Sequence, residues 1–122
     1  MRVVEIAFAA YPVTDLKRAR AFYEETLGLE VSHVFGDDSK AWVEYDIGPG
    51  TLAITNMVPE WEASPAGGTV GLEVDDFDES ISRLQEHNVM FLQEPLESPV
   101  CRMAVIMDTE GNSITIHKRK AL

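Results

Sequence analysis

Glu73 and His117 are the two side chains whose types and strand positions suit proton transfer in this sequence. Each falls in the alternation of a predicted strand on the side that carries small or polar residues, so the two could act as acid–base partners. The simpler alternative for His117 is a solvent-exposed histidine, because it precedes the basic stretch "KRK" near the end of the chain. Glu44 could reach the same side, although an exposed strand glutamate is an equally simple interpretation. These three residues are the catalytic candidates.

A second set of residues could form the wall of an apolar, adaptable pocket or an interface. It contains Trp42, Trp61 and Met103. Core filling is the default role for such side chains. Trp61 is the most indicative of the three, because it lies in the Pro- and Gly-containing stretch "VPEWEASPAGG", which offers few core neighbours in sequence.

Two helices that must position these residues are predicted from apolar side chains spaced at three and four residues. The first covers 15–27 and ends before Gly28, which suits a left-handed C-cap. The second covers 77–87 and can end at Asn88.

The rest of the chain alternates as half-buried strands do, and turn residues separate the segments. Eight main strands are predicted: one beginning at Phe8, "VSHVF", "AWVEYDI", "TLAITNM", one over 69–74, "VMFLQ", "RMAVIM" and "SITIHK". The order is strand, helix and three strands, and the same order then follows again.

A residue-level match supports this repeat, because "VTDL" at 13–16 and "VDDF" at 74–77 are 61 positions apart (74 − 13). We therefore predict an α+β fold of two βαβββ modules that form a curved mixed sheet with the helices outside. The expected organisation is a single domain, 1–122, with module 1 at about 1–57, a linker at 58–68 and module 2 at about 69–119.

The alternation also predicts which side of each strand faces the helices. Leu52 and Ile54 have the bulk expected of a helix-packed face, which leaves Ala53 on the other face. The same argument leaves Thr69 and Thr115 opposite the large aliphatic residues of their strands. A small, polar face suits a pocket, and a sheet face simply exposed to water is the alternative.

Composition excludes several classes of partner. The net charge of −11 would repel phosphate backbones and anionic lipid surfaces, so nucleic acid is disfavoured. No apolar run is long enough for a membrane span. The single cysteine, Cys101, excludes an internal disulfide and fits a reducing cytoplasm. His33 and His87 fit exposed positions in a strand and at a helix end.

The segments "YPVTDLKRARAFYEETLGLEV", "GLEVDDFDESISRL" and "DTEGNSITI" together resemble the vicinal oxygen chelate superfamily. This superfamily contains glyoxalase I, bleomycin-resistance proteins and extradiol dioxygenases, and the resemblance covers nearly the whole chain. It implies the fold above and a homodimer whose cavities lie near or across the interface. It does not imply one activity, because the scaffold serves different chemistries.

Metal-dependent members of the superfamily hold one divalent ion with His or Glu at four strand positions. Carried over to this sequence, the positions fall on Phe8, Ala53, Thr69 and Thr115. None of these side chains is an imidazole, carboxylate or thiolate, which Zn²⁺, Ni²⁺ and Fe²⁺ require. We therefore expect no metal and no other cofactor.

Three functions follow as hypotheses. The favoured one is metal-independent binding of a small organic molecule in a dimeric cavity, as in bleomycin-resistance-like members. Its expected ligand-binding residues are Phe8, Trp42, Ala53, Thr69, Thr115, Trp61 and Met103. The alternatives are a glyoxalase I-like lyase or extradiol dioxygenase-like metalloenzyme with a displaced metal site, and a metal-free acid–base enzyme that uses Glu73, His117 or Glu44.

Overall fold

The computed structural model describes residues 1–121 and divides into two compact units, one from Met1 to Glu62 and the other beginning at Ala63. Each unit has the order strand, helix and three strands. The predicted βαβββ fold is confirmed, and the strands form two four-stranded mixed sheets, one in each unit. Among residues 1–121, no helix combines the length and the apolar character needed to cross a membrane.

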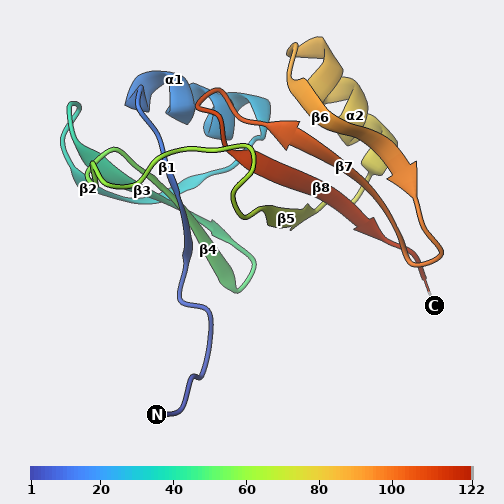
Figure 1. The fold of residues 1–122 in the computed structure, drawn as a ribbon, viewed down its shortest axis with the longest axis horizontal. Helices are drawn as coiled ribbons and strands as arrows, with labels where there is room; N and C mark the ends of the chain where they lie inside the picture. The colour runs from blue at the N-terminus through green and yellow to red at the C-terminus, as the bar shows by residue number, and fades with distance from the viewer. Residues whose placement is uncertain (122) are drawn as a thin grey trace. The chain divides into compact units, whose positions relative to one another are not determined.

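The first unit pairs its strands in the order β1-β4-β3-β2 (Figure 1). Strand β1 runs parallel to β4, and the other neighbours are antiparallel. Its elements are β1 (Ala9–Pro12), α1 (Leu16–Ala21), the π-helix η1 (Phe22–Thr26), β2 (Val31–Gly36), β3 (Ala41–Ile47) and β4 (Gly50–Thr55).

The helix of the first unit covers the sheet face that carries Leu52 and Ile54. Tyr23 stacks on Tyr45 with ring centroids 6.0 Å apart, and Tyr45 lies directly opposite Leu52 in the sheet. The predicted helix 15–27 is thus present, but its second half has π geometry, with Leu27 N–H donating to the Phe22 carbonyl. The wider turn accompanies the burial of two adjacent aromatic rings, Phe22 and Tyr23.

The second unit pairs its strands in the order β5-β8-β7-β6. Its elements are β5 (Val70–Glu73), α2 (Phe77–Glu86), β6 (Met90–Glu97), β7 (Cys101–Met107) and β8 (Ser113–Arg119). The Arg102 guanidinium lies 4.5 Å from the centroid of the Phe77 ring, so α2 covers the face that Arg102 shares with Ala104 and Ile106. Thr115 and His117 lie on the opposite face, as predicted.

Several strand boundaries differ from the prediction. The first strand of each unit starts one residue later than expected, so Phe8 and Thr69 directly precede β1 and β5. Strand β6 continues to Glu97, well beyond the predicted "VMFLQ", because irregular pairing with β7 extends it. This edge position tolerates Pro95, which has no backbone N–H for a ladder.

Both helices are followed by the residues that the sequence predicts to end them. Gly28 and Asn88 have left-handed backbone angles, with φ of 74° and 56°. Between β4 and β5 the described chain contains no helix or strand, and the boundary of the two units falls there, after Glu62.

Candidate functional site

Four aromatic side chains of the first unit gather on the sheet face opposite α1, and we call this set the aromatic face: Phe8, Phe35, Trp42 and Trp61. Phe8 meets Trp42 edge to face at 5.1 Å between ring centroids, and Trp61 lies 6.4 Å from Trp42. Phe8 and Trp61 keep 46% and 44% of their surface exposed. Exposed rings that already contact one another offer an apolar surface for an organic molecule.

Glu44 lies beside this set. Its Oε2 accepts a hydrogen bond of 2.9 Å from Nε1 of Trp42, which fixes the indole ring. Its Oε1 faces Nδ1 of His33 at 3.6 Å, too far for a hydrogen bond. The structure therefore brings together Phe8, Trp42, Trp61 and Glu44, four of the residues predicted from the sequence.

Two neighbours of this group were not predicted as site residues. Phe35 lies opposite Trp42 and His33 opposite Glu44 in the β2–β3 pairing, and their rings stack at 6.0 Å. The turn residues after Phe35 indicated a hairpin, but the closure of Gly36 onto Ala41, which makes the opposed pairs from His33 to Gly36 sum to 77 (36 + 41, 35 + 42), is seen only in the structure. Exposure at 55% leaves Phe35 available for contact.

Ala53 and Thr115 occupy the expected faces but are buried. Ala53 lies opposite Glu44, and Thr115 lies opposite Gly71 and Val105. Their small side chains therefore support the two faces and are not accessible themselves.

The face of the second unit opposite α2 carries a row of hydroxyl groups. Oγ1 of Thr69 lies 3.0 Å from Oγ1 of Thr115, and Oγ of Ser113 donates to Oγ1 of Thr69 at 3.2 Å. Three hydroxyls that bond to one another form a small polar network where β5 begins.

Glu73 and His117 meet further along the same face. His117 Nδ1 lies 2.6 Å from Glu73 Oε1, and the Arg119 backbone N–H donates to Glu73 Oε2 at 2.7 Å. The hydrogen bond from Arg119, together with that from His117, holds the pKa of Glu73 below its usual range. A carboxylate that holds Nδ1 leaves Nε2 to exchange a proton with another molecule. Met103 is half-buried opposite His117.

The four positions that the family resemblance aligns with metal ligands do not carry side chains that fit a metal ion. They supply a phenyl ring, a methyl group and two hydroxyls, and the hydroxyls are bonded to each other. A displaced site would need other donors, yet residues 1–121 contain no group of three His, Cys, Asp or Glu side chains placed to hold an ion.

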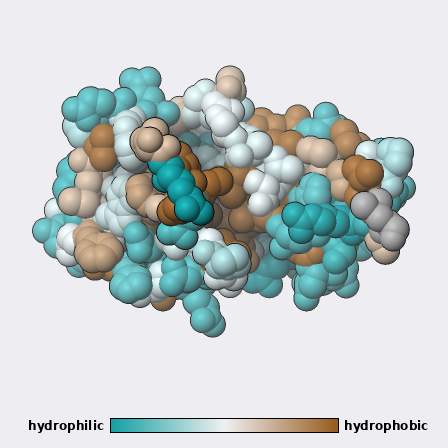
Figure 2. Space-filling model, turned by 90° about the horizontal axis from the view of Figure 1, so that it is seen from below, coloured by the Kyte–Doolittle hydropathy of each residue, from teal (hydrophilic) through white to brown (hydrophobic). Residues whose placement is uncertain are grey.

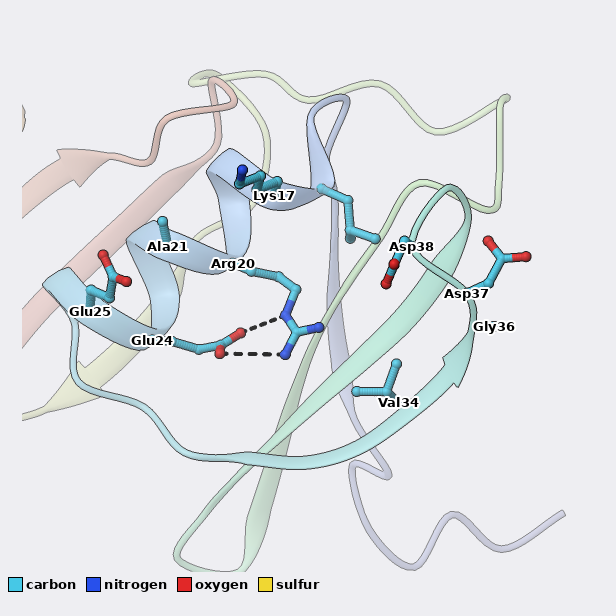
Figure 3. Close-up of a pocket in the computed structure, with 10 residues that line it drawn as sticks. Lys17, Arg20, Ala21, Glu24, Glu25, Val34, Gly36, Asp37 and Asp38 are labelled. Carbon is cyan, nitrogen blue, oxygen red and sulfur yellow. Dashed lines mark hydrogen bonds and ion pairs between the residues drawn. The ribbon is translucent and has the colours of Figure 1, made fainter.

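A groove of about 670 Å³ lies on the other side of the first sheet, between α1 and the turn after β2 (Figure 3). Most of its lining residues are charged: Lys17, Arg20, Glu24, Glu25, Asp37 and Asp38. Asp37 accepts hydrogen bonds from Ser39 and from the Lys40 backbone, which lowers its pKa and shapes the turn. These interactions close the hairpin.

The inner end of this groove is a hydrogen-bonded triad. Arg20 Nε donates to Glu24 Oε2 at 2.7 Å, and the Tyr45 hydroxyl donates to the same oxygen at 2.9 Å. Burial raises the pKa of Tyr45 well above its usual range, and the hydrogen bond to Glu24 adds to the effect. The hydrogen bond with Glu24 in turn raises the pKa of Arg20. The triad serves the packing of α1 and η1 on the sheet.

The sequence and the fold were compared with known proteins. The family described as Glyoxalase/Bleomycin resistance protein/Dioxygenase superfamily matches residues 5–116. No curated protein matches the chain.

Solved structures resemble the chain over nearly its whole length. TnmS3, an antibiotic binding protein from Streptomyces sp. CB03234, is 25% identical with a TM-score of 0.81, and the match covers 98% of this chain and 99% of TnmS3. A glyoxalase/bleomycin resistance protein from the same organism is 28% identical with a TM-score of 0.72, and the match covers 92% and 98%. Lactoylglutathione lyase from Agrobacterium tumefaciens, at 21% identity, a TM-score of 0.74 and coverage of 97% and 96%, shares the fold alone.

Proposed function

Because the chain belongs to the Glyoxalase/Bleomycin resistance protein/Dioxygenase superfamily, we propose that it binds a small organic molecule at its aromatic face, without a metal. The observation that carries this proposal is the contact of Trp42 with Phe8, edge to face, and with Trp61, at a tilt, while Phe8 and Trp61 remain nearly half exposed. Each added aromatic contact contributes about 0.5–1.5 kcal/mol beyond the burial of area. TnmS3, described as an antibiotic binding protein, supports the same class of function.

The proposal includes a homodimer. Val3, Val4 and Ile6 are exposed by 77% to 85%, and the segment that carries them leads away from the strands of its own unit (Figure 1). Hydrophobic surface also remains visible on the outside of the chain (Figure 2). A second copy would cover such side chains and bring more residues to a shared cavity. Light scattering should give twice the chain mass, and a monomer at micromolar concentration would contradict this part.

The composition of the chain bears on its partners and on its location in the cell. A net charge of −11 disfavours nucleic acid as a partner, and a single cysteine fits a reducing cytoplasm.

A second candidate function is metal-free acid–base catalysis, and the 2.6 Å contact between His117 and Glu73 favours it. If this function holds, His117→Ala should abolish turnover of a bound compound and leave its binding intact. Conversion of a compound at equal rates by the variant and the parent would remove the pair from catalysis.

Tryptophan fluorescence tests the binding function directly, because Trp42 and Trp61 are the only two tryptophans of the chain. A panel of planar organic compounds, antibiotics included, should contain members that change the emission and raise the melting temperature. Chelator should change neither result. Trp61→Ala should weaken binding, and Met90→Ala, an exposed hydrophobic residue on β6, is the matched control. A panel without any binder would contradict the proposal.

A further inference from the structure

The sheet side that carries the aromatic face also carries carboxylates, and its strand residues include no lysine or arginine. Lys40, which precedes β3, donates from Nζ to the Asn56 carbonyl at 3.3 Å. The register of β1 to β4 places ten residues on this side of the sheet: Ala10, Pro12, His33, Phe35, Trp42, Glu44, Asp46, Thr51, Ala53 and Thr55. None of these ten is lysine or arginine, and two are acidic. The sheet side therefore carries a formal charge of −2 with His33 neutral, from Glu44 and Asp46.

Glu44 is positioned to act as a counter-ion. Only 22% of its side chain is exposed, and one of its oxygens is committed to the Trp42 indole at 2.9 Å. Within residues 1–121 its ion-pair contact is with His33 alone, at 3.6 Å, and that imidazole is 60% exposed. The Glu44 carboxylate thus lies beside the rings without an ion pair to lysine or arginine among residues 1–121.

From this arrangement we infer that the aromatic face selects ligands that carry an organic cation, such as a protonated or quaternary amine on an apolar or aromatic body. The inference rests on the proposed function and specifies its ligand class. The faces of aromatic rings carry negative electrostatic potential, so they attract cations and disfavour anions. The adjacent carboxylate adds to both effects.

The same carboxylate decides between a cation and a neutral ligand. A neutral body that covers Trp42 removes water from Glu44 and offers its charge nothing in return, which is unfavourable. A cationic group restores the compensation and contacts the rings at the same time. The net charge of −11 also attracts cationic ligands from a distance.

Three probes that share a phenylethyl body and differ in charge test this inference: phenethyltrimethylammonium, 2-phenylethanol and 3-phenylpropionate. We expect the ammonium compound to bind about tenfold more tightly than the alcohol, and the carboxylate to bind most weakly. Tryptophan emission reports binding of each probe. Added salt should weaken binding of the ammonium compound and leave the alcohol unaffected, which tests the charge without any substitution.

Glu44→Gln keeps the shape and the acceptor for the indole N–H but removes the charge. It should bring the affinity of the ammonium compound close to that of the alcohol. Glu94→Gln, an exposed residue on β6, makes the same change in net charge and should retain the preference. Equal affinities for the cation and the alcohol in the parent, or a preference that survives Glu44→Gln, would overturn the inference. Either result leaves the proposed function standing, which fails only if the wider compound panel has no binder.

Discussion

The two units share one backbone plan and present different chemistry on equivalent positions. Phe8 corresponds to Thr69 and Trp42 to Met103, each 61 positions apart (69 − 8, 103 − 42). The partners in the sheet match as well, because Ala10 pairs with Ala53 as Gly71 pairs with Thr115. Where the first unit brings aromatic rings into edge-to-face contact, the second bonds hydroxyl groups to one another.

The sheet faces that pack against the helices differ far less between the two units. Tyr45 and Ile106 are equivalent (106 − 45 = 61), both fully buried, and each lies under the helix of its unit. Packing under a helix constrains size and hydrophobicity, because a change of volume there costs stability. The face opposite the helix does not pack under a helix, so its side chains can differ in size and polarity. This is why one scaffold can carry aromatic rings on that face in one unit and hydroxyl groups in the other.

The largest effect is expected where the first unit departs from simple aliphatic packing. Tyr45→Ala should lower the free energy of unfolding by about 3–5 kcal/mol, because it removes a fully buried ring stacked on Tyr23. Tyr45→Phe keeps the ring and loses only the hydrogen bond to Glu24, so it should cost about 1 kcal/mol. Urea unfolding measures both variants. Equal losses would mean that the hydroxyl, and not the ring, holds α1 and η1 on the sheet.

The next largest effect is expected on ligand binding, and it distinguishes the aromatic face of the first unit from the corresponding face of the second unit. For a compound found to bind by fluorescence, Trp42→Ala should reduce affinity by about tenfold, since it removes the central ring of the aromatic face. Met103→Ala, at the equivalent position of the second unit, should reduce affinity much less. Calorimetry is the measurement, because the first variant also removes a reporter. If Met103→Ala has the larger effect, the ligand lies on the second unit.

Residues that follow a local pattern were predictable, and residues that depend on long-range register were not. Leu52 and Ile54 could be assigned to the helix side because a strand alternates with period two. The same alternation predicted that Glu73 and His117 lie on the same face of the sheet. It could not join Phe35 to Trp42, which needs the exact closure of the hairpin, nor show that Glu44 bonds the Trp42 indole, which depends on rotamers. The π geometry of Phe22–Thr26 also lay beyond a pattern that only registers steps of three and four.

A smaller effect is expected from the hydroxyl row. Thr115→Val preserves the shape but removes the bond to Thr69, and should lower the free energy of unfolding by about 1 kcal/mol. Thr51→Val is the matched control, since its hydroxyl bonds the exposed Asp46 on β3. Its loss should be smaller, because water can replace that bond. A parent-like Thr115→Val would show that the hydroxyl row adds nothing to the stability of the second unit.

The smallest effect is a dependence of stability on pH that arises from Glu73. Its pKa is lowered in the folded chain, first by the hydrogen bond from the Arg119 backbone and then by the one from His117. A lowered folded pKa means that the charged carboxylate stabilises the fold above the pKa of the unfolded chain, and that this contribution disappears as pH falls through the folded pKa. Glu73→Gln should therefore melt slightly below the parent at about pH 7, and the difference should shrink as the pH is lowered through the acid range. Glu94→Gln, an exposed residue on β6, makes the same change in net charge and is the matched control. If the difference in melting temperature between Glu73→Gln and the parent stays the same at acidic pH, the side chain acts through its shape and neutral hydrogen bonds. The charge of Glu73 would then not contribute to the stability of the fold.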